Sequence, residues 1–315
     1  MSTALVRTFL RRLTFCTVWY NHSGLAMDIA TRQKELRTGL IGAGILLSSS
    51  PAIHMDEAAA QGVPCRYELF DLERRADGSA ALPALLDECE QRGFAGLNIT
   101  FPCKQSVLPL LHELSQDAAA LQSVNTVLFR AGRRIGHNTD WWGFAESFRR
   151  GLPDADMRRV ALVGAGGAGA AVGYAALTLG AGELRIFDAD SARAAGLATR
   201  LAALFPARRV HAVGSVDAAL ADCTGLIHAT PTGMQKLPGM PVPAGLLKAP
   251  MWVAEIVYVP LVTELLQAAR HNGCRTLDGS GMAVFQAARA LELFSGLKPD
   301  TGRMLRNFTS KLAEA

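Results

Sequence analysis

The sequence has no long hydrophobic run, few cysteines and lysines, and only a small net charge. No apolar stretch reaches the roughly 18–20 residues that a membrane-spanning helix needs, so we expect no membrane association. A formal net charge of +4 at pH 7 is too small to predict an obligate nucleic-acid binder. The six cysteines form no Cys-x-x-Cys pair, which argues against a disulfide scaffold and predicts reduced thiols in a cytoplasmic protein.

The remaining composition is that of a globular protein with a large core. The 315 residues are 50% hydrophobic and 19% charged, enough for one large domain or two of ordinary size. Only six of the 32 basic residues are lysines. A lysine in an apolar setting therefore stands out, because a permanently charged arginine serves proton transfer poorly. The seven histidines show no His-x-His or His-x-x-x-His spacing, and we expect no metal.

The first 37 residues differ from the rest of the chain. Residues 1–27 contain three arginines and neither aspartate nor glutamate. A signal or transit peptide is one alternative, but the apolar stretch 13–20 is short and interrupted by Thr14 and Thr17, and no clean cleavage pattern follows. We interpret residues 1–37 as a disordered leader, with Met27 as an alternative initiator.

From residue 38 on, strand-like and helix-like segments alternate. Strands are expected at 39–42, 66–70, 96–101, 159–163, 184–187, 210–213, 226–229 and 252–257, with a hairpin over 124–136. Helices are expected at 51–61, 82–92, 107–121, 139–150, 170–179 and 283–294. This alternation predicts an α/β fold with a parallel sheet and helices on both faces. Residues 151–156 mark the expected boundary between two halves.

A Gly-x-Gly-x-x-Gly pattern follows the strand at 159–163 and precedes an alanine-rich helix. Its residues are Gly164, Ala165, Gly166, Gly167, Ala168 and Gly169. In this context the glycines allow a tight turn, close backbone approach to a pyrophosphate, and packing of helix on strand. The helix N-terminus adds unpaired N–H groups and a positive dipole end. We interpret the loop as a dinucleotide site, the alternative being a glycine-rich turn without a ligand.

Asp188 ends the next expected strand, 19 residues after Gly169. An acidic residue there accepts hydrogen bonds from the adenosine ribose and repels a 2′-phosphate, which favours NAD over NADP. Arg193 works against this preference, because it could reach a 2′-phosphate. The alternative is a turn or cap residue, although Asp190 and Ser191 are available to cap the following helix.

Polar residues that interrupt apolar segments are the candidates for chemistry. Lys104 follows a buried strand and Pro102, where lost solvation would suit it to proton transfer, although an ordinary lysine at a helix start is the alternative. Asp140 precedes a helix and could equally be its cap. Asn125 breaks a β-branched strand, so its amide must find partners.

Three serines, Ser48, Ser49 and Ser50, precede Pro51 at an expected helix start. Hydroxyls and backbone N–H groups gathered at such a position suit a carboxylate ligand. The alternative is that one of them only caps the helix.

Together these segments resemble the shikimate/quinate dehydrogenase family from about residue 38 to the C-terminal helix. The matching segments are Ser48-Ser49-Ser50-Pro51, Asn98 to Lys104, Val124-Asn125-Thr126, Asn138-Thr139-Asp140, Gly164 to Gly169, Ala229-Thr230-Pro231, Tyr258, and Asp278-Gly279-Ser280-Gly281-Met282 with Gln286. The resemblance implies a discontinuous α/β substrate domain, residues 38–140 completed by 279–315. A Rossmann-type parallel-sheet dinucleotide-binding domain would occupy residues 141–278.

The resemblance also implies a role for each site residue. Lys104 and Asp140 would form the catalytic pair. The residues that would bind substrate are Ser48 and Ser50 at the carboxylate, with Thr100, Asn125, Tyr258 and Gln286, beside Asp140, around the ring hydroxyls. Beyond the glycine loop, Asp188 and Arg193, the implied cofactor contacts are Ala229 and, beside the nicotinamide, Ile256, Gly279 and Met282.

The implied reaction is hydride transfer between C3 of shikimate or quinate and NAD, by a monomer or homodimer with no nucleic-acid or membrane partner. Biosynthetic NADP-using members carry Asn-Arg-Thr/Ser where this chain has Asp188-Ala189-Asp190, so it resembles the NAD-using branch more. Ser49 departs from the lysine or arginine often present between the two serines. An NADP-dependent biosynthetic enzyme and a non-catalytic NAD(P) sensor remain the alternatives.

Overall fold

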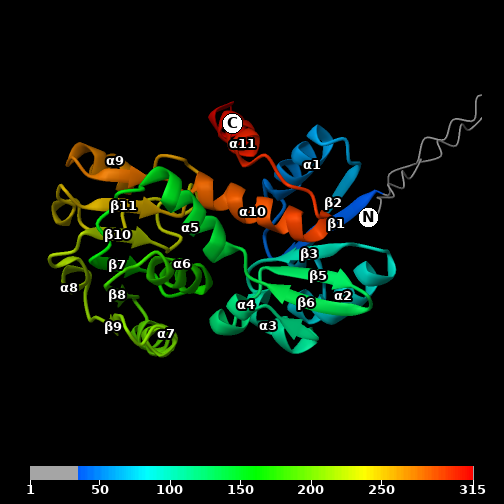
Figure 1. Ribbon diagram of the computed structural model, residues 1–315, viewed down its shortest axis with the longest axis horizontal. Coiled ribbons are helices and arrows are strands. Elements are labelled where there is room, and N and C mark those ends of the chain that lie inside the picture. The colour runs from blue at the N-terminus through cyan, green and yellow to red at the C-terminus, as the bar shows by residue number, and fades with distance from the viewer. Residues whose placement is uncertain (1–34, 315) are drawn as a thin grey trace, which may run out of the picture. The chain divides into compact units, whose positions relative to one another are not determined.

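The computed structural model describes residues 35–314. The leader expected at residues 1–37 therefore lies almost entirely outside the described residues. The first strand, β1, begins at Leu36, two residues before the expected start of the fold. The described residues are built on two six-stranded sheets, which Figure 1 shows with their helices.

The first sheet is mixed and has the strand order β2-β1-β3-β5-β6-β4. Its strands are β1 (Leu36–Gly42), β2 (Cys65–Asp71), β3 (Gly96–Ile99), β4 (Glu113–Leu114), β5 (Thr126–Arg130) and β6 (Arg133–His137). β1 pairs in parallel with β2 and β3, whereas β5 runs antiparallel to β3 and β6. The hairpin expected over 124–136 is thus confirmed as β5 and β6.

The helices of this part are α1 (Ser50–Ala60), α2 (Leu82–Gln91), α3 (Cys103–Ser106) and α4 (Gln116–Leu121). The single helix expected over 107–121 is wrong. Pro109 cannot continue a helical hydrogen-bond pattern, and only a 3-10 turn, Leu108–Leu110, forms around it. The chain then passes through β4, and Ser115 starts α4 by accepting the Ala118 N–H.

The second sheet is parallel throughout, with the order β12-β11-β10-β7-β8-β9. Its strands are β7 (Arg159–Val163), β8 (Glu183–Phe187), β9 (Arg209–Ala212), β10 (Gly225–His228), β11 (Trp252–Glu255) and β12 (Arg275–Leu277). β7 has β8 on one side and β10 on the other, so the winding reverses there, which is where such sheets bind ligands. The predicted α/β class is confirmed.

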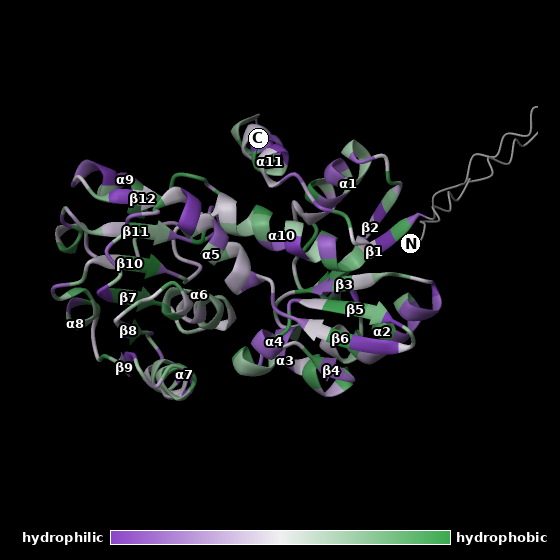
Figure 2. Cartoon of the chain, in the orientation of Figure 1, coloured by the Kyte–Doolittle hydropathy of each residue, from purple (hydrophilic) through white to green (hydrophobic). Residues whose placement is uncertain are grey.

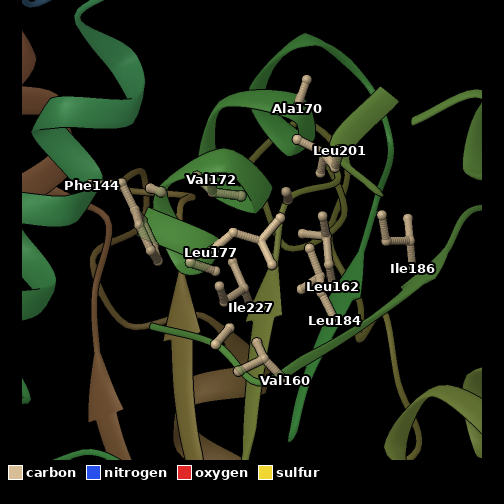
Figure 3. Close-up of a cluster of buried hydrophobic side chains, with 14 of the residues drawn as sticks. Phe144, Val160, Leu162, Ala170, Val172, Leu177, Leu184, Ile186, Leu201 and Ile227 are labelled. Atoms are coloured by element: carbon tan, nitrogen blue, oxygen red, sulfur yellow. The ribbon is translucent and has the colours of Figure 1, made fainter. Parts of the chain in front are cut away.

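Alternate residues of the strands in this sheet enter two different cores. Val160 and Leu162 face one core cluster, and Ala161 and Val163 face another, so both faces are buried. Figure 3 shows the first cluster, where Leu162 meets side chains of the covering helices. The helices of this part are α5 (Asp140–Gly151), α6 (Gly167–Thr178), α7 (Ser191–Leu204), α8 (Val216–Leu220) and α9 (Glu264–His271).

Two helices follow the second sheet, α10 (Ser280–Ser295) and α11 (Thr301–Glu314). α10 lies alongside α5 (Figure 1). Gly143 and Gly281 make the close approach possible: a Cβ at Gly143 would lie 2.7 Å from the Gln286 nitrogen, and one at Gly281 would lie 2.1 Å from Ser147 Oγ. Figure 2 shows hydrophobic residues along α10, eight of which are buried.

Membrane-spanning helices, clusters of metal ligands and disulfides are absent among the described residues. Within residues 35–314 no helix is long and apolar enough to cross a membrane. In the same range no three metal-ligating side chains gather. The five cysteines found there are free thiols.

Candidate active site

Lys104 and Asp140 form an ion pair with Nζ 2.6 Å from Oδ2. Lys104 lies in α3, just after β3, and Asp140 is the first residue of α5, just after β6. The two side chains are only 21% and 10% exposed, so solvent screens the pair weakly. Asp140 does not cap α5, because Thr139 occupies the N-cap position and the Asp140 carboxylate contacts other side chains.

Asn125 holds the other side of the Asp140 carboxylate. Its Nδ2 lies 2.9 Å from both Asp140 Oδ1 and Thr139 Oγ1, and 3.4 Å from Gln286 Oε1. Its Oδ1 accepts the Thr139 N–H at 2.8 Å. Both carboxylate oxygens of Asp140 therefore have a partner, one on Lys104 and one on Asn125.

The network continues into the sheet through three buried residues that are absent from the sequence-based set. The Tyr67 hydroxyl donates to Asn98 Oδ1 at 2.9 Å, Asn98 Nδ2 donates to Thr126 Oγ1 at 3.1 Å, and Thr126 Oγ1 donates to Asn125 Oδ1 at 3.1 Å. Burial raises the pKa of Tyr67 and keeps its hydroxyl protonated. The sequence signal that could have identified these three residues is a polar side chain within an apolar strand, since buried polar groups need partners.

Two close approaches place Thr100 beside Gly42 at the end of β1 and Gln286 beside the Asp140 network. Thr100 follows β3, and its Cγ2 would lie 2.2 Å from a Cβ on Gly42, so only glycine fits at the end of β1. Gln286 lies on α10, and the contact of that helix with Gly143 of α5 brings its Oε1 within 3.5 Å of Thr139 Oγ1. The structure thus gathers Lys104, Asp140, Asn125 and Gln286 into one network.

The serine turn precedes and begins α1. Ser49 is at the N-cap position, but its side chain makes no cap hydrogen bond. Ser48 Oγ instead accepts the Ser50 N–H at 3.2 Å and lies 3.1 Å from Ser50 Oγ. His54 lies 2.9 Å from the Ser50 carbonyl through Nδ1, and burial lowers the pKa of His54 to about 4, so a neutral ring donates this bond. The two serine hydroxyls lie side by side on a rigid turn.

Tyr258 follows β11 and contacts the C-terminal helix. Its ring centroid lies 5.7 Å from that of Phe308 on α11, and burial raises the pKa of its hydroxyl. Among residues 35–314 Tyr258 shares no hydrogen bond with the Lys104–Asp140 network, and of the two serines only Ser50 reaches it, through a hydrogen bond with the Tyr67 hydroxyl at its far end. A substrate would have to connect these groups.

The glycine loop has the geometry of a phosphate cradle. Gly164 has φ of +106°, and a Cβ there would lie 2.7 Å from the Ala229 carbonyl. A Cβ on Gly169 would lie 2.0 Å from Gly164 O, so α6 packs on the loop only without a side chain. Gly166, directly before α6, has open space around it. The space and the unpaired N–H groups at this helix start fit a pyrophosphate.

Asp188 contacts this loop directly. Its Oδ2 accepts the Ala165 N–H at 2.7 Å, and its Oδ1 accepts the Asp190 N–H at 2.9 Å. Asp190 caps α7, as expected, by accepting the N–H groups of Ala192 and Arg193. The Arg193 side chain is 67% exposed and pairs with Asp190 at 3.2 Å. Asp188 therefore keeps unused lone pairs at the loop, while Arg193 is held by a weak surface pair.

The other proposed cofactor contacts lie around the ends of β10 and β11. Ala229 donates its N–H to Val163 O of β7, and Ile256 donates to His228 O. A Cβ on Gly279 would lie 2.3 Å from Ile256 O. Met282, which is 9% exposed, lies near the start of α10, where that helix contacts Gly143 of α5.

The ion pair and the glycine loop approach each other. Lys104 Cδ lies 4.0 Å from the position of a Cβ on Gly167, the first residue of α6. A poorly exposed lysine–carboxylate pair thus lies beside the glycine-rich loop, an arrangement that suits proton transfer next to a bound dinucleotide.

Known proteins share this chain's sequence and fold. Residues 40–127 match the shikimate dehydrogenase substrate binding domain. A shikimate dehydrogenase (NADP(+)) of Streptomyces avermitilis is 53% identical over 275 residues, which cover 87% of this chain and 94% of that protein. A quinate/shikimate dehydrogenase (NAD(+)) of Corynebacterium efficiens is 47% identical over 276 residues, 86% of this chain and 97% of that protein.

The structural comparison agrees. A quinate dehydrogenase from Corynebacterium glutamicum, solved in complex with NAD, superposes with a TM-score of 0.83 at 44% identity and covers 88% of this chain and 99% of that one. The similarity covers nearly the full length of each relative, and it holds for the sequence as well as for the fold. The chain therefore belongs to the shikimate/quinate dehydrogenase family of oxidoreductases.

Proposed function

We propose that the protein oxidises the C3 hydroxyl of quinate and of shikimate to the 3-dehydro ketone, with NAD preferred as cofactor. The observation that carries the proposal is the 2.6 Å contact of Lys104 Nζ with Asp140 Oδ2, beside the start of α6. Relatives whose names include quinate, shikimate and NAD support the substrate and cofactor.

Oxidation at C3 requires the hydroxyl proton to leave as the hydride departs. We assign its acceptance to the Lys104–Asp140 pair: Lys104 Nζ takes up the hydroxyl proton as it passes one of its own protons to Asp140 Oδ2, which ends the step protonated. Asn125 Nδ2, by donating to Oδ1, keeps Oδ2 directed at Lys104.

The remaining site residues bind the two ligands. Ser48 and Ser50 would donate to the substrate carboxylate, and Thr100, Asn125, Tyr258 and Gln286 would surround the ring. A bound dinucleotide supplies the hydride acceptor. Residues 164–169 would hold its pyrophosphate, Asp188 its adenosine ribose, and Ala229, Ile256, Gly279 and Met282 its nicotinamide half.

Replacement of Ser48 or Ser50 by alanine is expected to raise KM for quinate or shikimate by about 10- to 100-fold with little change in kcat. Each loses a hydrogen bond to a charged group, worth ~1.5–3 kcal/mol. Ser49→Ala is the matched control, because its hydroxyl makes no cap hydrogen bond. If Ser48→Ala and Ser50→Ala lower Tm and leave KM unchanged, these serines serve only the start of the helix.

Both quinate and shikimate are expected to be oxidised. Quinate has a tetrahedral C1 with an extra hydroxyl, and small side chains at 48, 49 and 50 leave room for it. Initial rates of each acid with NAD⁺ and with NADP⁺ provide the test of the proposed function. Turnover of shikimate alone with NADP⁺ would favour the biosynthetic alternative, which the 53% identical NADP-dependent relative supports. No turnover in any of the four mixtures would favour a sensor.

The same proposal includes the division of the chain and its location. We assign residues 38–140 with 279–315 to substrate and 141–278 to cofactor, because the first sheet ends at His137 and the second spans Arg159 to Leu277.

The free thiols among the described residues support a cytoplasmic protein. A monomer or homodimer is expected, and sedimentation measures it.

A further inference from the structure

A second ionisable pair, His228 and Glu255, is buried at the carboxyl edge of the parallel sheet. The two residues are the last of β10 and β11 and lie directly opposite each other in the strand register. They are 0% and 1% exposed. His228 Nδ1 lies 2.8 and 3.0 Å from the two oxygens of Glu255.

Each member of the pair also contacts the segment that follows its own strand. Glu255 Oε1 accepts the Val257 N–H at 3.0 Å, and Oε2 accepts from Thr263 Oγ1 at 3.2 Å. His228 Nε2 lies 2.5 Å from Thr230 Oγ1, which itself accepts the Thr232 N–H. The pair thus fixes two loops, 229–232 after β10 and 256–258 after β11.

These two loops border the proposed cofactor site, the first at the glycine loop and the second beside Gly279. The first carries Ala229 and Thr230, against which Gly164 packs: a Cβ there would lie 2.7 Å from Ala229 O and 2.9 Å from Thr230 Cγ2. The second carries Ile256, whose carbonyl lies 2.3 Å from the position of a Cβ on Gly279. Any shift of either loop would move atoms that line the cofactor site.

Stability alone is a poor reason for such a pair. Desolvation of two ionisable groups offsets most of their attraction, and packed apolar side chains would hold two strands together at least as well. What the polar pair adds is direction, because the bonds to Val257 N and Thr230 Oγ1 have defined geometry. Direction matters where a ligand must be positioned.

We propose that His228 and Glu255 are positioning residues for the nicotinamide half of the dinucleotide. They act through the backbone of loops 229–232 and 256–258. The inference rests on the proposed function, since it presupposes a nicotinamide cofactor at the carboxyl edge of the sheet.

The test is Glu255→Gln, read by equilibrium binding of NAD⁺ and of ADP-ribose, which lacks the nicotinamide. Glutamine keeps the shape but has one acceptor oxygen, so Val257 N–H and Thr263 O–H cannot both be satisfied. The Kd for NAD⁺ is expected to rise about tenfold, the effect of one lost bond to a charged group. ADP-ribose uses the glycine loop and Asp188 only, and its Kd is expected to change less than about twofold by the same reasoning.

Glu183→Gln is the matched control. Glu183 is a nearly buried carboxylate, paired with Arg185 at 2.9 Å, at the opposite end of the same sheet. Its loss is expected to lower Tm without changing either Kd. If Glu255→Gln does not fold, Thr230→Val removes the contacts of Thr230 Oγ1 with His228 Nε2 and with the Thr232 N–H, and should shift the NAD⁺ Kd in the same selective way.

The outcomes separate this inference from the proposed function. Equal changes in both Kd values, or none in either, would overturn the positioning role. A wild-type protein that binds neither NAD⁺ nor ADP-ribose, nor their 2′-phosphorylated forms, would instead refute the proposed function. If the wild type takes only the 2′-phosphorylated pair, the same comparison is made with NADP⁺ and 2′-phospho-ADP-ribose.

Discussion

Replacement of Lys104 by alanine is expected to lower kcat by about 10²–10⁴-fold, the usual effect of a positioned acid–base group. The Nζ atom lies 2.6 Å from Asp140 Oδ2, and removing it leaves the carboxylate without the partner that receives the proton. Steady-state rates at saturating quinate and NAD⁺ measure the loss. Binding of ADP-ribose should barely change, because its proposed contacts are the glycine loop and Asp188.

The chain offers a matched lysine–aspartate pair outside the site. Lys311 Nζ of α11 lies 2.5 Å from Asp56 Oδ2 of α1, with both side chains exposed. Lys311→Ala removes a similar contact, and its kcat is expected to stay near that of the wild type, as exposed pairs contribute little. Near-normal turnover of Lys104→Ala would remove that lysine from the mechanism.

Local sequence signals predicted most of the fold of the parallel sheet. Apolar strands followed by glycine turns and alanine-rich helices located β7, β8 and α6 to within a few residues. The signal failed at residues 107–121, where apolar spacing indicated one helix while Pro109 broke it. Helices α8, α9 and α11 and strand β12 were not expected, because they are short or polar and depend on packing against the sheets.

The site was predictable where chemistry follows a local motif and not where it depends on strand pairing. Lys104 and Asp140 could be named from their positions at the ends of segments, but nothing local indicates that they meet. The Tyr67–Asn98 bond links β2 and β3 across the intervening β1, and the His228–Glu255 pair joins the neighbouring strands β10 and β11. Strand order is set by the whole domain, so a single sequence does not reveal which buried polar residues become partners.

The structure changes the expected behaviour of Asp188. Both of its oxygens already accept backbone N–H groups, from Ala165 and Asp190, so it orients the glycine loop and keeps lone pairs for ribose hydroxyls. Arg193 does not contact it and pairs with Asp190 on the surface. Because an exposed pair is weak, Arg193 can turn toward a phosphate and soften its repulsion by Asp188 without reversing it.

Asp188→Asn is therefore expected to raise the ratio of kcat/KM for NADP⁺ to that for NAD⁺ by about 10²–10³-fold, while kcat with NAD⁺ changes little. Two like charges about 4 Å apart repel by ~4 kcal/mol at an effective dielectric constant near 20, and the amide removes that repulsion. Asparagine has one oxygen, so it must also give up the Ala165 or Asp190 N–H, which should weaken binding of both cofactors alike and leave the ratio as the clean measure.

Asp222→Asn is the matched control for this substitution. Asp222 is 82% exposed and pairs only distantly, at 3.8 Å, with Arg159, the first residue of β7 and so at the opposite end of the sheet from the glycine loop. It loses the same charge, and its cofactor ratio is expected to match that of the wild type, since charges beyond about 10 Å are largely screened at 0.1 M salt. A wild type that already prefers NADP⁺, or an Asp188→Asn protein with an unchanged ratio, would mean that Asp188 serves the loop alone and that cofactor preference is set by other residues.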